Sequence, residues 1–147
     1  MKDVHIAVGS AVIVLFAATG LWGAWCWWRV EPSRLFWRLL RTSQVVLLIQ
    51  IALGGVLELE GRKVPSLHIL YGLLPLAVSF VAEQLRISTA EMVLSGRGFE
   101  SATEVGELPE EEQQFIVLTI LRRELGVMTL AALVIVVLAL RAAMTAS

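Results

Sequence analysis

The chain has very little cysteine, histidine and charge. Among 147 residues there are one cysteine and two histidines, and 17% of the residues are charged. The single Cys26 excludes an internal disulfide, a Cys-x-x-Cys metal site and the Cys-x-x-Cys-His attachment of a c-type haem. A formal net charge of −1, without a basic stripe or a nucleic-acid motif, argues against nucleic acid as a partner.

Apolar residues make up 57% of the chain, and they come in long blocks rather than in alternation. Such blocks indicate helices that cross a lipid bilayer. By length the chain is one domain, residues 1–147. The predicted fold is therefore an all-α, integral membrane four-helix bundle, with spans at about 6–28, 42–57, 67–85 and 125–140.

Basic residues are unevenly distributed between the two ends of these spans. Eight lie in the connections at 29–41, 86–97 and 122–123, where the tryptophans between residues 22 and 37 also gather as an aromatic belt. The opposite side carries only Lys2, Arg62, Lys63 and Arg141. The positive-inside rule predicts a multi-pass protein of the cell (plasma) membrane, with both termini and the 58–66 loop outside the cytoplasm.

The segment 87–114 is the only sizeable polar part of the chain. It is acidic, and its glycines at positions 96, 98 and 106 favour irregular structure. We expect a solvated cytoplasmic loop here, with a docking surface for a partner subunit as the alternative. A helix leading into the fourth span begins as early as Pro109 in this interpretation.

The two histidines open two spans that run in the same direction. The first reads His5-Ile-Ala-Val-Gly9 and the third reads His68-Ile-Leu-Tyr-Gly72. Both imidazoles are therefore expected at the same depth, on the same side of the membrane. Residues i and i+4 share a helix face, so each glycine leaves room for a flat ring just beyond its histidine. Imidazole is a common axial ligand of haem iron, and the pattern predicts a haem b held non-covalently between His5 and His68.

Other residues near this pair are candidates for the same site. Gln50 lies inside the second span, where it is either an interhelical hydrogen-bond partner or a wall of a haem or quinone pocket. Arg62 and Lys63 precede His68 and are candidate partners for the haem propionates. A zinc or copper site is the competing interpretation, but two imidazoles alone are incomplete and need Asp3 or Glu60.

The run Leu47-Leu48-Ile49-Gln50-Ile51-Ala52-Leu53-Gly54-Gly55, a short loop and then Leu67-His68-Ile69-Leu70 resembles the haem A synthase family. Members of that family contain two similar four-helix bundles, each with a pair of haem-ligating histidines at its outer side. The resemblance covers about residues 5–86 and implies one such bundle, with His5 and His68 as ligands. A homodimer of this chain would rebuild an eight-helix body.

The chain departs from the family at the catalytic motif. Where the catalytic half of the family has a glutamate three residues before its first histidine, this chain has Lys2. We therefore expect no catalytic residue, and a bis-histidine protein for electron transfer or haem handling, as a homo-oligomer or within a larger respiratory complex. Two alternatives stay open: a half-length haem A synthase-like enzyme acting as a homo-oligomer, with Asp3 as its carboxylate, and a haem-free accessory membrane subunit.

Overall fold

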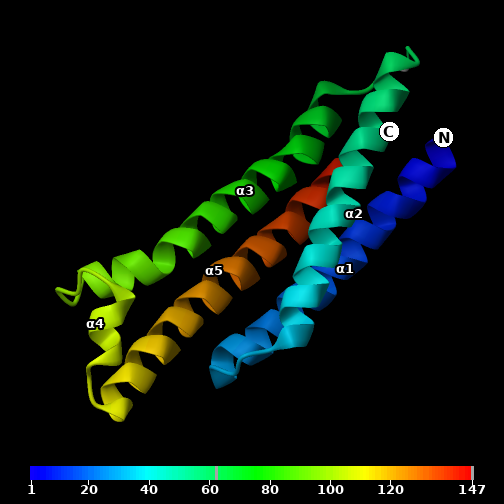
Figure 1. Ribbon diagram of the computed structural model, residues 1–147. Coiled ribbons are helices and arrows are strands. Elements are labelled where there is room, and N and C mark those ends of the chain that lie inside the picture. Colours follow the sequence, from blue (N-terminus) through cyan, green and yellow to red (C-terminus); the bar gives the residue numbers. More distant parts are fainter. Residues whose placement is uncertain (62, 147) are drawn as a thin grey trace.

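The computed structural model describes residues 1–61 and 63–146, and every regular element in these ranges is a helix. Four helices are each long and apolar enough to cross a membrane. The all-α prediction is thereby confirmed, with four helices of the length and apolarity that the predicted spans require. The helices are α1 (Lys2–Arg29), α2 (Arg34–Leu59), α3 (Ser66–Ser95), a short α4 (Ala102–Gly106) and α5 (Glu110–Met144) (Figure 1).

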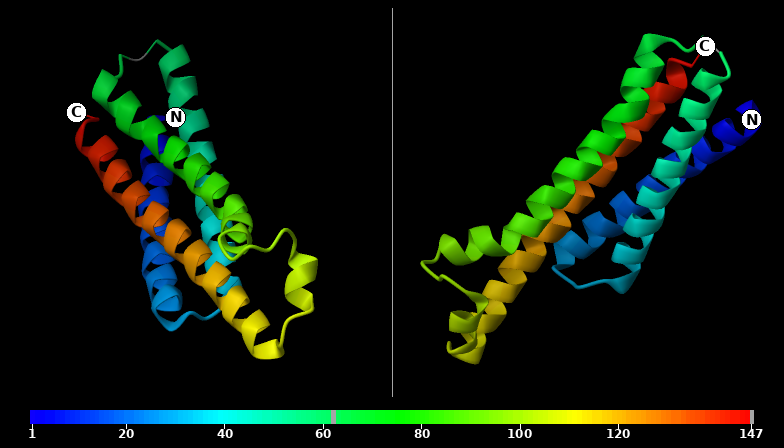
Figure 2. Two further views of the ribbon diagram at one scale, coloured as in Figure 1. Left: turned by 90° about the vertical axis from the view of Figure 1, so that its left-hand side faces the viewer. Right: turned by 45° about the horizontal axis from the view of Figure 1, so that its top comes forward.

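The four long helices alternate in direction along the chain. Both described ends of the chain and the α2–α3 connection lie at one end of the bundle, whereas the α1–α2 connection and α4 lie toward the other (Figure 1; Figure 2). Helices α3 and α5 lie side by side in each view, and α5 also packs closely against α1. The contact between α2 and α3 is slight by comparison. Helix α5 is therefore the element on which α1 and α3 pack, while α2 packs mainly against α1.

The connection between α1 and α2 is a tight turn. Val30 ends α1 in the left-handed conformation, with φ 52°, which a β-branched residue rarely adopts. Ser33 then caps α2, because its hydroxyl oxygen accepts from the Phe36 backbone N–H at 3.2 Å. The same oxygen accepts from the Trp22 indole N–H at 2.9 Å, which ties the turn to α1.

Two helices extend well beyond the apolar segments that predict them. Helix α3 continues to Ser95 and α4 lies within the segment, so the expected irregular structure at 87–114 is wrong there, whereas α5 starts at Glu110, next to the predicted start at Pro109. The reason is tertiary packing, since Thr89, Val93 and Ile116 are buried where the two helices continue beyond the apolar core. Only 96–101 and 107–109 flank α4 as irregular chain, and Gly98 there has φ 82°.

The core consists of two layers, each of which contains different residues of α5. One layer joins Phe16 of α1 to Leu47 of α2 and Ile135 of α5. The other joins Phe36 of α2 to Leu125 of α5. Between these layers the buried Thr19 and Ser43 hydroxyls form a hydrogen bond of 3.0 Å between α1 and α2.

Glycine allows the helices to approach closely at three places. A methyl group at Gly23 would lie 2.5 Å from Phe36 Cε2, one at Gly20 would strike Leu133, and one at Gly126 would lie 2.9 Å from Trp27 Cε2. Lipid tails are as apolar as leucine, so helix association in a bilayer depends on this kind of close backbone approach and on interhelical hydrogen bonds. These glycines set the distance between α1 and its neighbours.

Substitution of Gly23 by alanine is expected to destabilise the bundle. The added methyl group has no space beside the rigid Phe36 ring, and overpacking of this kind costs about 1–3 kcal/mol. Gly55 is the matched control, because it lies in a membrane helix with no atom within 4 Å of an added methyl group. Thermal unfolding in detergent should show a lower midpoint for Gly23→Ala and an unchanged or higher one for Gly55→Ala. Equal midpoints would contradict the close packing of α1.

Candidate functional site

The structure brings the two histidines of the chain together. The ring centroids of His5 on α1 and His68 on α3 are 6.1 Å apart, and the ring planes are inclined by 60°. Both rings lie at the end of the bundle where α1 and α3 begin. Residues 63 positions apart in the sequence therefore form one pair, as their shared register predicts.

The orientation of His68 is fixed by the backbone of α5. Its Nδ1 lies 2.8 Å from the carbonyl oxygen of Ala142. A carbonyl can only accept, so Nδ1 carries the proton and donates it, which leaves the lone pair on Nε2. Imidazoles that bind metal ions are almost always held in this way, with the second ring nitrogen donating to a carbonyl or carboxylate.

The orientation of His5 is set by Gln50 on α2. The amide nitrogen of Gln50 lies 3.2 Å from His5 Nε2, while His5 Nδ1 and Gln50 Oε1 are buried without a hydrogen-bond partner among the described residues. Amide oxygen and nitrogen exchange places by a half-turn about the last side-chain bond. With the oxygen toward the ring, His5 donates from Nε2 and keeps its lone pair on the unpartnered Nδ1. Metal ligation through His5 Nδ1 therefore requires the Gln50 amide oxygen, and not its nitrogen, to lie against His5 Nε2.

The separation of the two rings matches one metal ion between them. With metal–nitrogen bonds of about 2.0 Å on each side, two imidazoles that share one metal from opposite sides have ring centroids roughly 6 Å apart. Within residues 1–61 and 63–146 no three histidine, cysteine or carboxylate side chains form a metal-binding group. Asp3 and Glu60 are thus not grouped with the two histidines in the described structure. The donor set is two nitrogens, which is what a haem requires because the porphyrin supplies the other four.

The glycines of the site differ from the sequence prediction in one respect. Gly72 does have open space, with no atom within 4 Å of an added methyl group. Gly9, in contrast, faces the Gln50 amide, whose nitrogen would lie 2.8 Å from a methyl group there. The glycine that faces the His5 ring is Gly54 of α2, at 3.3 Å from an added methyl to Cε1. The open side of the pair is therefore that of α3, because the Gln50 side chain fills the space beside Gly9.

Positive charge is present at the same end of the bundle. Lys63 is exposed, and Arg62 lies outside the described residues, so its predicted role is not placed. Arg141 directly precedes Ala142, and its guanidinium lies 5.5 Å from the centre of the Tyr71 ring. Sequence reasoning missed Arg141 and the Ala142 carbonyl as parts of this site. A backbone acceptor has no sequence signal, and Arg141 is far from both histidines in the chain.

A second polar cluster lies between α2 and α3, away from the histidines along both helices. The Glu83 carboxylate binds the guanidinium groups of Arg41 and Arg86, the latter at 2.9 Å, and it accepts from the Gln44 amide at 3.0 Å. Gln44 also donates to the Ser79 hydroxyl at 3.1 Å. Every oxygen of the carboxylate is occupied by a cationic or amide donor. The cluster is thus a structural link between α2 and α3, which otherwise contact each other little.

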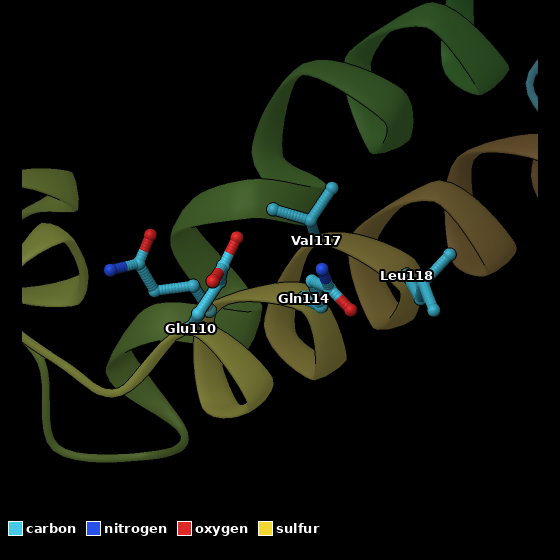
Figure 3. Close-up of a pocket in the computed structure, with 5 residues that line it drawn as sticks. Glu110, Gln114, Val117 and Leu118 are labelled. Atoms are coloured by element: carbon cyan, nitrogen blue, oxygen red, sulfur yellow. The ribbon is translucent and has the colours of Figure 1, made fainter.

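A third polar feature is a hollow along the first turns of α5. Glu110, Gln114, Val117 and Leu118 line it, and their side chains project from the same helix (Figure 3). Because all of its lining residues, Gln113 included, come from α5, the hollow has no facing donors from a second element. Among the described residues, its lining contains no pair of metal-ligating side chains comparable with the two histidines.

The comparisons with known proteins give no relative. The chain matches no protein-family model, no curated protein and no solved structure. The fold is all-α, with four helices long and apolar enough to cross a membrane, and its distinctive feature is the pair of imidazoles where four helices meet.

We predict that neutral His68 is protonated at Nδ1. The Ala142 carbonyl accepts a hydrogen bond only from a protonated nitrogen, so the hydrogen bond holds the proton of neutral His68 on Nδ1. Long-range ¹H–¹⁵N spectra of histidine-labelled protein, at a pH where the imidazoles are neutral, should show this form. The His5→Ala variant assigns the remaining signals to His68. A signal with the proton on Nε2 would contradict the hydrogen bond to α5.

Proposed function

We propose that this chain is a membrane protein that binds one b-type haem between His5 and His68. The observation that carries the proposal is the pair of imidazoles, with ring centroids 6.1 Å apart and each with one ring nitrogen free of hydrogen bonds to the described residues. A buried polar atom without a partner costs about 1–3 kcal/mol, so a ligand at this place would relieve a cost that the haem-free protein carries at His5 Nδ1.

The chain's own groups account for holding and orienting such a haem. Ala142 and Gln50 fix the two rings, Gly72 leaves open space beside His68, and Lys63 and Arg141 supply positive charge near the site for the propionates. A bound haem iron supplies one-electron redox chemistry, whose potential depends on its axial ligands and surroundings. We propose electron transfer or haem handling as the use of the site.

The resemblance to one bundle of the haem A synthase family supports the same proposal. It supplies a precedent for two histidines at the outer end of a four-helix unit, and it suggests a homo-oligomer or a larger respiratory complex as the assembled form. Lys2 occupies the position of the family's catalytic glutamate, and Asp3 is exposed and forms no metal-binding group with the histidines. For this reason we propose that the protein holds haem rather than oxidising it.

The orientation in the plasma membrane follows from the charges. Arg29, Arg34, Arg97, Arg122 and Arg123 belong to the segments toward the α4 end of the bundle, which we therefore assign to the cytoplasm. The histidine pair then faces the outer side, together with both described chain ends. This assignment places the haem within reach of redox partners outside the cytoplasm.

Haem-replete protein is expected to show the narrow Soret and α bands of low-spin, six-coordinate iron on reduction. His5→Ala and His68→Ala should each remove this signature, because each variant lacks one of the two iron ligands. Loss of even an outer-shell partner of a ligand lowers metal affinity about 10–100-fold, and loss of the ligand itself should cost at least as much. Tyr71→Phe is the control on the same helix, and it should keep the bands. Unchanged bands in both histidine variants would refute the ligand assignment.

A second pair of variants separates haem binding from folding. Gly72→Leu adds bulk on the open side of His68, where the haem-free protein has space, so it should lower haem content without lowering the unfolding midpoint. Gly55→Leu adds the same bulk at another open position of a membrane helix and should keep haem. Equal haem content in the two variants would place the porphyrin elsewhere.

Labelling of introduced cysteines tests the orientation. The native Cys26 is buried and is replaced by serine in both variants. A membrane-impermeant maleimide added to intact cells should label Glu60→Cys, in the α2–α3 connection, and should leave Glu100→Cys, beside α4, unlabelled until the membrane is opened. The reverse pattern would invert the proposed topology.

A further inference from the structure

A second candidate binding site lies at the opposite end of the bundle from the histidines. It is a groove of about 380 Å³ between α3 and α5, with Trp27 of α1 at its base. Helices α3 and α5 lie side by side along this region (Figure 2). This volume falls within the range of about 300–1,000 Å³ that small-molecule sites occupy.

The walls of the groove are apolar and open toward the surroundings of the bundle. Leu85 and Met92 of α3 are each 46% exposed, and Leu130 of α5 is 52% exposed. The hydroxyl of Thr89, which also lines the groove, donates to the Leu85 carbonyl at 2.8 Å and is therefore satisfied. Such a surface suits a hydrocarbon chain.

Gly126 leaves the space in which Trp27 lies against α5 within the groove. A methyl group at Gly126 would lie 3.0 Å from Trp27 Nε1, so the indole ring lies flat against the backbone of α5. The indole N–H makes no hydrogen bond within the part of the chain that the structure describes, and it borders the groove. It is a donor available to an ester or phosphate oxygen.

One end of the groove is strongly basic. Arg122 and Arg123 line it, both are exposed, and neither forms a salt bridge among residues 1–61 and 63–146. The acidic residues nearest in sequence, Glu91 and Glu124, are not part of the lining. The groove thus joins two free guanidinium groups to an apolar channel at the start of the membrane segment of α5.

We infer that this groove binds an anionic phospholipid, with one acyl chain along α3 and α5 and the phosphate at Arg122 and Arg123. Arginine is well suited to phosphate because its planar N–H groups can bind two oxygens at once. Long basic side chains also reach from apolar surface to the headgroup region. This inference depends on the membrane helices and is independent of haem binding.

Native mass spectrometry of the purified protein tests this site. The protein is loaded from detergent with equal amounts of phosphatidylglycerol and phosphatidylcholine that carry the same acyl chains. We expect preferential retention of phosphatidylglycerol. The double variant Arg122→Gln/Arg123→Gln should lose this preference several-fold. The matched control is Arg34→Gln/Arg38→Gln, which removes two exposed arginines outside the groove and should retain it.

Two further measurements separate the lipid from other occupants. Met92→Trp fills the groove but keeps its charge, and it should also lower retention while the unfolding midpoint stays unchanged. Glycerol phosphate, which has the charge without the chain, should not displace the lipid. Equal retention of both lipids, an equal loss in the control variant, displacement by glycerol phosphate, or a second copy of the chain in place of lipid would each overturn the proposal.

Discussion

The close approach of α1 to α5 is the contact on which the rest of the structure depends. It requires the absence of side chains at Gly20 and Gly126, where leucine and tryptophan side chains from the facing helix lie against bare backbone. Within a bilayer this packing replaces the hydrophobic drive of a soluble core. Helix α3 packs on the same α5, so the position of α5 determines how far His5 and His68 stand apart. The donor pair is thus a product of helix packing rather than of local sequence.

Much of the architecture could be predicted, because a bilayer leaves a helix few alternatives. Four apolar runs gave four helices, and their alternating directions placed His5 and His68 at one end of the bundle. The early start of α5 could be predicted from Pro109, but the length of α3 could not, since residues such as Val93 become helical and buried through contacts beyond the apolar segment. Glycines and acidic residues there resembled a solvated loop, and tertiary packing outweighed that composition.

The site itself was only partly visible in the sequence. The ligand candidates could be found from their spacing, and Gln50 from its polarity within an apolar run. The Ala142 carbonyl could not, since every residue carries such a group and only folding selects one. Gly9 lacks its expected open space because the Gln50 side chain lies against it, and Gly54, for which no role was predicted, faces the His5 ring instead. Trp27, which is expected in the aromatic belt, also lines a groove, and its polarity and sequence position gave no sign of this.

The hydrogen bond from His68 to Ala142 has a consequence for the order of assembly. During synthesis Gln50, which orients His5, is made with α2, whereas Ala142, which orients His68, is made only with α5. A partly made chain can bring His5 and His68 into the membrane, but nothing yet fixes the His68 ring. Insertion of α5 is therefore the step that fixes the His68 ring, so any cofactor held by both imidazoles is received only after α5 has been inserted.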